Sequence, residues 1–163
     1  RKYFGFDMFK FKQQNALITG GEILAIMKLK SMKGLQWKEG FTFTNGKLDN
    51  GIYLPFIPAY KIASSIRYEK SLKRKITSCF IEAEYLYLFR QDHPSVFETA
   101  TTDYGLINLF SGATLKASHG NWRLGFNITN LTNSTYADHL SRIKYYGLYN
   151  PGINFVISVR KAF

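Results

Sequence analysis

The chain has 163 residues, 45% hydrophobic and 17% aromatic, which suits one folded domain and is unlike the composition of a disordered protein. Lys and Arg number 22 against 11 Asp and Glu, and this formal charge of +11 suits nucleic acid, an anionic membrane surface or an acidic partner. Cys79 is the only cysteine, which excludes an intrachain disulfide, and His93, His119 and His139 lack the spacing of metal ligands.

The beginning of the chain carries no targeting segment that can be recognised. It starts at "RKYFGFDMF", without an initiator methionine or a signal peptide, so we expect that residue 1 is not the start of the gene product. No stretch reaches the ~18 apolar residues of a membrane-spanning helix. The basic residues are spread along the chain, and we interpret their one dense run, "EKSLKRK" (69–75), as a solvated turn.

Apolar residues recur at every second position through most of the chain, and this period predicts β-strands. In "FTFTN", for example, Phe41 and Phe43 alternate with threonines, and in "NWRLGFNIT" the apolar positions begin at Trp122. We therefore predict eight strands in an all-β, antiparallel arrangement. They span residues 2–12, 16–29, 35–45, 58–68, 76–90, 104–117, 121–131 and 151–163.

Many of these strands have the ~9–11 residues that cross a bilayer at a tilt. One face of each is aromatic and aliphatic, and the other is small, hydroxylated or charged. Alternation alone does not say which face points outward, because a soluble lipocalin-like barrel shows the same period.

The predicted connections alternate in length after a first short hairpin around 13–15. Short turns at 30–34, 69–75 and 118–120 alternate with long loops at 46–58, 91–103 and 132–151. Short turns on one rim and long loops on the other are typical of outer-membrane barrels. An ordinary meander with uneven loops is the alternative.

The last forty residues carry three short motifs in order. The penultimate predicted strand ends in Asn-Leu-x-Asn-x-x-Tyr, a His-Leu-Ser loop follows, and Asn-Pro-Gly leads into the final strand. The residues are Asn130, Leu131, Asn133, Tyr136, His139, Leu140, Ser141, Asn150, Pro151 and Gly152. In these motifs the segment resembles the C-terminal end of TonB-dependent outer-membrane receptors.

Two further segments resemble the same family, and two positions depart from it. "TGGEI" matches the family's Gly-x-Glu at Gly20 and Glu22, and "LPFIPAYKIASSIRYE" matches its Leu-Pro-x-x-Pro segment. Ile153 stands where the family commonly has Arg, which removes one expected polar contact. Lys161 interrupts the apolar face of the last strand, where its head can reach water while its stem stays apolar.

The resemblance implies a segment of a larger, 22-stranded transmembrane barrel in the bacterial outer membrane. Residues 1–163 then form its C-terminal portion, and the plug domain is absent from them. Such receptors take up scarce nutrients such as iron-siderophores, cobalamin or glycans, and the TonB energy-transducing complex drives them through the plug. The barrel assembly machinery inserts them, and the terminal aromatic, here Phe163, is the expected assembly signal.

The same interpretation implies transport and not catalysis, with no cofactor and no nucleic-acid partner. The expected partners are the TonB complex, outer-membrane lipid, the barrel assembly machinery and a small nutrient ligand. The alternative is a complete eight-stranded barrel, either a soluble lipocalin-like carrier or a small outer-membrane barrel.

Candidate ligand-binding residues lie in the long loops. Asp92 and His93 in "RQDHPS" stand where a ligand arriving at that rim would first meet the protein, although two residues alone are weak evidence for a metal site. Tyr145 and Tyr146 can stack on an aromatic or sugar ligand, or can belong to the interfacial aromatic girdle.

Two other groups of polar residues have structural interpretations. Glu82 and Glu84 project from one face of a strand about 7 Å apart, where we expect them to meet Arg or Lys from a neighbouring strand or from the plug and not to act as paired catalytic carboxylates. "NITNLTNST" contains three glycosylation-type signatures, at Asn127, Asn130 and Asn133. Asn127 falls in the middle of a predicted strand on the non-lipid face, and the family resemblance implies that all three are asparagines of a strand end, so we expect structural roles and not glycosylation.

Overall fold

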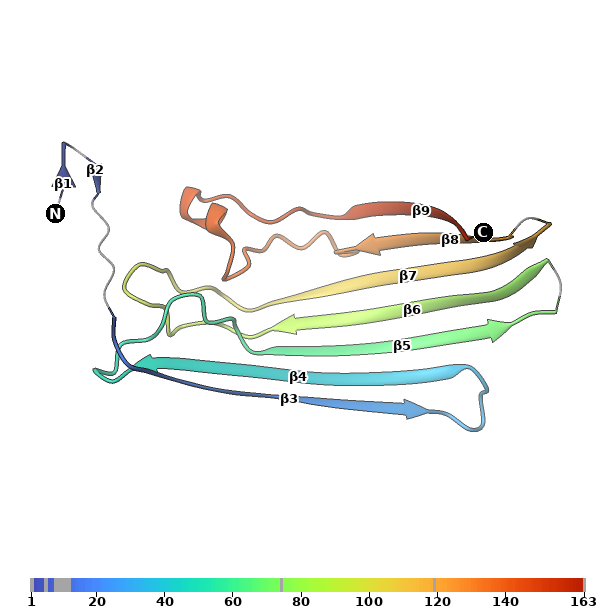
Figure 1. The fold of residues 1–163 in the computed structure, drawn as a ribbon, viewed down its shortest axis with the longest axis horizontal. Coiled ribbons are helices and arrows are strands. Elements are labelled where there is room, and N and C mark those ends of the chain that lie inside the picture. The colour runs from blue at the N-terminus through green and yellow to red at the C-terminus, as the bar shows by residue number, and fades with distance from the viewer. Residues whose placement is uncertain (1, 5, 8–12, 74, 119, 163) are drawn as a thin grey trace.

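Seven antiparallel strands form one sheet, in which each strand pairs with its neighbour in the sequence (Figure 1). The structure is a computed structural model that describes the chain except for residues 1, 5, 8–12, 74, 119 and 163. The order β3 to β9 confirms the predicted all-β, up-and-down arrangement. The strands are β3 (Ala16–Lys28), β4 (Leu35–Leu48), β5 (Lys61–Ser71), β6 (Ile76–Leu88), β7 (Tyr104–Ala117), β8 (Gly120–Thr129) and β9 (Asn154–Ala162).

The first predicted strand, residues 2–12, is wrong within the part of it that the structure describes. Two two-residue strands, β1 (Lys2–Tyr3) and β2 (Phe6–Asp7), pair with each other in a small separate hairpin. Phe4, between them, has a φ of 49°, a left-handed conformation that turns the chain instead of extending it. Residues 8–12, like Phe163, lie outside the described residues.

The other strand boundaries differ from the predicted ones by a few residues. β5 begins at Lys61 and not at 58, and β9 begins at Asn154 and not at 151. Proline stands at both predicted starts, Pro58 and Pro151, and its missing N–H cannot donate to a strand ladder. β8 ends at Thr129 because Asn130 takes a φ of 51° and turns the chain away from the sheet.

Register across the sheet separates the side chains onto two faces. Ile23 lies opposite Phe41, and Arg67 lies opposite Glu82, so residues paired across neighbouring strands share one face of the sheet. One face, called the apolar face below, includes Ile23, Phe41, Ile66, Ile81, Leu124 and Ile157. The opposite face, called the polar face, includes Glu22, Lys38, Arg67, Glu82, Asn108 and Arg123.

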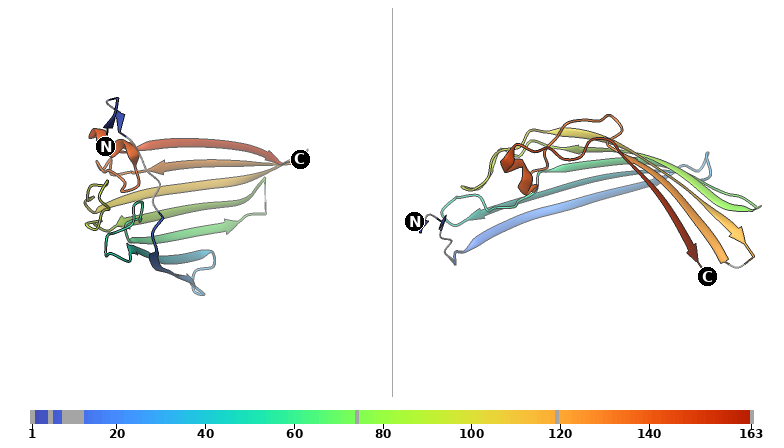
Figure 2. Two further views of the ribbon diagram at one scale, coloured as in Figure 1. Left: turned by 60° about the vertical axis from the view of Figure 1, so that its left-hand side comes forward. Right: turned by 90° about the horizontal axis from the view of Figure 1, so that it is seen from above.

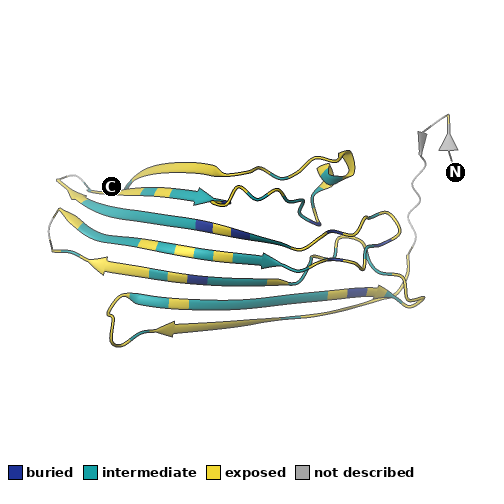
Figure 3. Ribbon diagram, turned by 180° about the vertical axis from the view of Figure 1, so that it is seen from behind, coloured by how far each residue is buried: buried dark blue, intermediate teal, exposed yellow. Residues whose placement is uncertain are grey.

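The apolar face is exposed and not packed into a core. Ile23, Ile81 and Ile157 are 67%, 58% and 77% exposed, and among the described residues Leu106 is the only buried hydrophobic one. Figure 3 shows that both edge strands, β3 and β9, are exposed over most of their length. Such an extended apolar surface on a folded sheet indicates contact with another apolar phase or partner.

Polar groups on the apolar face are few, and two of them lie beside tryptophans. Ser64 accepts a hydrogen bond from the indole N–H of Trp37 at 3.1 Å. The ammonium of Lys161 lies 5.5 Å from the centre of the Trp122 ring, its register partner on the same face. That its head reaches water stays a prediction. Glu39 stands on this face in register with Ser64.

Long loops and short turns lie at opposite ends of the sheet, as predicted. The segments 49–60, 89–103 and 130–153 gather at one end, and the C-terminal end of β9 lies with the tight turns at the other (Figures 1 and 2). Figure 2 also shows that the sheet is curved and not flat. In the part of the chain that the structure describes, no helix is both long and apolar enough to span a membrane.

Charged side chains on the polar face are paired across the strands. The guanidinium of Arg67 donates to Glu82 at 3.1 Å and to Glu69 at 3.0 Å, and it lies 3.7 Å from the centre of the Phe80 ring. Glu84 accepts a hydrogen bond from the amide of Asn108 at 2.7 Å. The prediction of a basic partner is therefore confirmed for Glu82, which pairs with an arginine of the neighbouring strand. For Glu84 it is wrong, because this carboxylate meets an amide and no Arg or Lys within salt-bridge distance among the described residues.

We predict that Glu82→Gln lowers the free energy of unfolding by about 1–2 kcal/mol, because a charge-assisted hydrogen bond of a mostly covered carboxylate is lost. The matched control is Glu69→Gln, since Glu69 contacts the same arginine but its side chain is 49% exposed, against 17% for Glu82. An exposed pair is worth less, so we expect a change of about 0.5 kcal/mol or below there. Urea unfolding in lipid vesicles measures the free energy of unfolding of both variants. Equal losses for the two would contradict the assignment of the Arg67–Glu82 pair as the stronger contact.

Candidate functional site

A cavity of about 420 Å³ opens on the polar face beneath the long loops. Its floor is formed by β4 to β7, and its cover is the loop 130–153, which returns over the polar face. The polar groups that line it are Thr42, Thr44, Lys61, Tyr104, Asp138, His139 and Asn150. The remaining lining is largely apolar and aromatic, so the cavity combines apolar walls with a few hydrogen-bonding groups, as small-molecule sites do.

Two asparagines fix the ends of the loop 130–153 against the sheet. The backbone N–H of Asn130 donates to the side chain of Asn108 at 3.0 Å, and the side chain of Asn130 both donates to and accepts from Ser134. The side-chain oxygen of Asn133 accepts from the backbone N–H of Ile153 at 3.0 Å. Asn130 is 3% exposed, so its structural role is confirmed and its amide is not available for modification.

Tyr104 holds the cover of the cavity against the sheet through one further hydrogen bond and one ring contact. The Tyr104 hydroxyl, at the start of β7, donates to the Asp138 carboxylate at 2.9 Å. The Tyr104 and Tyr136 rings lie with their centres 4.5 Å apart. Asn150 in turn accepts from the backbone N–H of Asp138 at 2.9 Å, so the two arms of the loop support each other.

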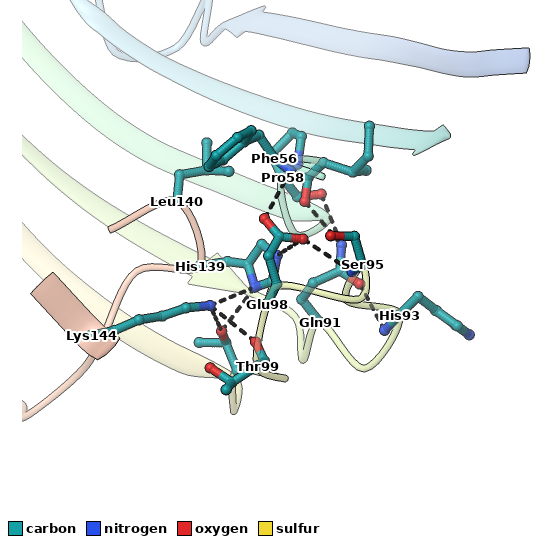
Figure 4. Close-up of polar contacts among 12 residues, drawn as sticks. Phe56, Pro58, Gln91, His93, Ser95, Glu98, Thr99, His139, Leu140 and Lys144 are labelled. Atoms are coloured by element: carbon teal, nitrogen blue, oxygen red, sulfur yellow. Dashed lines mark hydrogen bonds and ion pairs between the residues drawn. The ribbon is translucent and has the colours of Figure 1, made fainter. Parts of the chain in front are cut away.

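Glu98 connects the three long loops through its two carboxylate oxygens. Oε1 accepts from the backbone N–H of Phe56 at 2.8 Å, and Oε2 accepts from the backbone N–H of Ser95 at 3.1 Å. Oε2 also faces Nε2 of His139 at 3.9 Å, from the third loop (Figure 4). The side chains of Glu98 and His139 are 7% and 3% exposed, so this contact is shielded from water.

On its other side, the His139 ring meets Thr101 and Lys144. Its Nδ1 lies 2.9 Å from the Thr101 hydroxyl and 3.2 Å from the Lys144 ammonium. Lys144, in the short 3-10 helix η1 (Arg142–Tyr146), also donates to the carbonyl of Thr99 at 3.0 Å. These residues, Glu98, Thr101, His139 and Lys144, are called the loop cluster below (Figure 4).

The contacts within the loop cluster favour the neutral form of His139. An ammonium can only donate hydrogen bonds, so Nδ1 of His139 accepts from Lys144 and the ring proton lies on Nε2, toward Glu98. Burial and the Lys144 charge lower the pKa of His139, although Glu98 and Asp138 oppose the shift. Burial also lowers the pKa of Lys144. A proton added at Nδ1 would face the ammonium at 3.2 Å.

The loop residues that the sequence singled out lie elsewhere on the same rim. Asp92 and His93 contact each other at 3.3 Å, both are more than half exposed, and the His93 ring lies against the Tyr53 ring at a tilt of 37°. Tyr145 and Tyr146 lie on η1 and are 58% and 82% exposed. The structure shows neither pair lining the cavity, and their assignment to ligand binding stays a prediction.

Sequence reasoning missed the loop cluster because its members are far apart in the chain. Thr101 and His139 are separated by 38 positions, and Thr99 and Lys144 by 45. No local spacing marks Glu98, whose neighbours are ordinary loop residues. Among the described residues, no three His, Cys, Asp or Glu side chains gather closely enough to hold a metal ion.

Comparison with known proteins establishes the fold. Neither a scan against models of protein families nor a search of curated proteins finds a match. Among solved structures, the chain is similar to the copper transporter OprC, with a TM-score of 0.73 over 90% of this chain and 18% sequence identity. The match covers 23% of the OprC chain. The fold class predicted from the sequence, a segment of a larger up-and-down β-barrel, is confirmed.

We predict that the loop cluster loosens in acid. The folded pKa of His139 lies below its ordinary value of about 6.5, so the opened loops bind a proton more readily than the closed ones. The cluster therefore keeps its full stability above that pH and loses stability as the pH falls below it. Hydrogen exchange of segments 91–103 and 130–153, corrected for intrinsic rates, should show reduced protection at about pH 5 relative to about pH 7.5.

Two variants separate this effect from general acid sensitivity. His139→Gln should remove the histidine-dependent step between those pH values, whereas His93→Gln, at a more than half exposed position, should leave it in place. Identical pH profiles for the two variants would contradict the role of His139.

Proposed function

We propose that this chain is the C-terminal part of the barrel wall of a TonB-dependent outer-membrane receptor that imports a scarce small nutrient. The observation that carries the proposal is the division of the sheet into an exposed apolar face and a polar face with paired charges. A lipid-facing wall requires the first, and a water-filled lumen requires the second. The family resemblance of the sequence supports the same assignment.

The open sheet supports a segment of a larger barrel over a complete small one. β3 and β9 lie at opposite edges of the seven-stranded sheet and do not pair with each other. A barrel in lipid must close, because hydrocarbon offers no partners for unpaired backbone groups. The proposal therefore includes further strands beside both edges and a plug in the lumen.

The cavity beneath the long loops supports binding and release of a ligand, and we propose no catalytic role. Its lining has apolar walls and dispersed hydroxyl, amide and charged groups. OprC is a copper transporter, but the described residues of this chain hold no cluster of three metal-ligating side chains. The proposal accordingly assigns nutrient uptake without assigning copper as the substrate.

The test is nutrient uptake in cells that express the full-length protein from which this chain derives. Growth under limitation for iron, cobalamin, glycans or copper should show which nutrient depends on the protein. Uptake should fall to the level of cells without the receptor when the TonB complex is deleted, because transport is energised. A solute that enters by passive diffusion serves as the control. Uptake that persists without the complex would instead favour a barrel that works independently of TonB.

A further inference from the structure

We infer that the apolar face carries, at its long-loop rim, a site for the phosphate of an anionic lipid. The site is a cavity of about 340 Å³ whose lining includes Leu17, Thr19, Asn45, Lys47, Tyr53 and His93. The inference rests on the proposed function in one respect, namely that the apolar face contacts lipid. It does not depend on TonB or on any nutrient.

The cavity continues the apolar face and does not belong to the polar one. Lys47 and Asn45 alternate with the polar-face residues of β4 and share the side of Phe41 and Phe43. On β3, Leu17 and Thr19 lie opposite them in register. A molecule seated here would have its head among polar groups and its apolar part along the exposed apolar side chains of the same strands.

The height of the cavity matches the lipid headgroups. Trp37 and Lys47 are ten positions apart on the same face of β4. Ten residues of strand extend about 34 Å, and at a tilt of ~40° they cover about 26 Å of thickness, close to the ~25 Å apolar band of such barrels. With Trp37 at one interface, Lys47 therefore reaches the other.

The aromatic side chains below the cavity mark the same boundary. Phe41, Phe43 and Tyr60 form a cluster with ring centres 5.9–6.5 Å apart. The Tyr60 hydroxyl donates to Oδ1 of Asn45 at 2.7 Å. Asn45 is thereby oriented by an aromatic residue at the boundary, and its amide NH₂ remains a donor for a further acceptor.

Ring contacts position the cationic group of the site. The Lys47 ammonium lies 4.6 Å from the centre of the Tyr53 ring, and Lys47 and Tyr53 also form an isolated backbone bridge. The centres of the Tyr53 and His93 rings lie 4.7 Å apart, with the two rings tilted by 37°. Lys47 is nevertheless exposed, so its ammonium is shielded on one side and can meet an anion on the other.

The charges around the cavity favour an anion. Asp92 faces Nδ1 of His93 at 3.3 Å and has Arg90 on its other oxygen at 3.9 Å, so a cation lies beside this carboxylate and offsets part of its charge. Lys47 has the aromatic contact and no carboxylate within salt-bridge distance among the described residues. A lipid phosphate satisfies the ammonium, the Asn45 amide and the apolar face together, whereas free phosphate satisfies only the first two.

The experiment measures lipid binding to the full-length protein, freed of lipid in a non-ionic detergent, by native mass spectrometry. Diphosphorylated lipid A is the probe, phosphatidylcholine is the neutral lipid, and inorganic phosphate is the competitor. Lys47→Gln should weaken lipid A binding about fivefold, the effect of one basic residue at an anionic membrane surface. Lys47→Arg should retain binding. Lys38→Gln, on the opposite face of the same strand, is the matched control and should bind as the unchanged protein does.

The possible outcomes separate this inference from the proposed function. Equal binding by Lys47→Gln and Lys38→Gln would overturn the site, and so would equal binding of phosphatidylcholine. Competition by inorganic phosphate at ~10 mM, comparable to that by unlabelled lipid A, would make this a free-anion site and overturn the lipid assignment. The uptake assay bears only on the proposed function. Lipid A binding, and its weakening by Lys47→Gln, require no energy source and can be observed whether or not uptake depends on TonB.

Discussion

The pairing of backbone groups between neighbouring strands is the constraint on which the rest of this structure depends. A strand in hydrocarbon has no water to satisfy its N–H and C=O groups, so each must find a partner in the next strand. β3 and β4 pair over thirteen consecutive residues, from Ala16 opposite Leu48 to Lys28 opposite Gln36. Because side chains alternate strictly along such a ladder, it also forces the division into two faces.

The two ends of the sheet meet different requirements. Tight turns suffice at one rim, where Gly34 adopts a φ of 97° and a side chain would collide with the carbonyl oxygen of Glu69. The long loops at the other rim lie outside the strand ladder, so side chains satisfy part of their backbone groups in addition to a few backbone hydrogen bonds. Glu98 holds two backbone N–H groups from different loops, and His139 and Lys144 extend the same network. The stability of the loop that covers the cavity therefore depends on a few buried polar contacts.

The sequence predicts what is local in this fold and fails where the contacts are distant. Period-two alternation locates seven strands to within a few residues, since the faces are defined along each strand. The hairpin at Phe4 escaped prediction because backbone conformation there overrides an alternating pattern. The sequence predicted that Glu82 pairs with a basic residue, because of the face on which it lies. It did not predict which basic residue this would be. Glu98 and Lys144 gave no signal, because loops fold together only once the sheet has placed their ends.

The central claim is that the apolar face contacts lipid and the polar face contacts water. Spin labels at two adjacent aliphatic residues test it directly. Ile23 and Leu24 are 67% and 61% exposed and lie on opposite faces of β3. In vesicles, with Cys79→Ser as background, a label at Ile23→Cys should collide more with oxygen than with a water-soluble nickel complex. A label at Leu24→Cys should show the reverse. A Leu24→Cys label in lipid, or an Ile23→Cys label in water, would contradict the account.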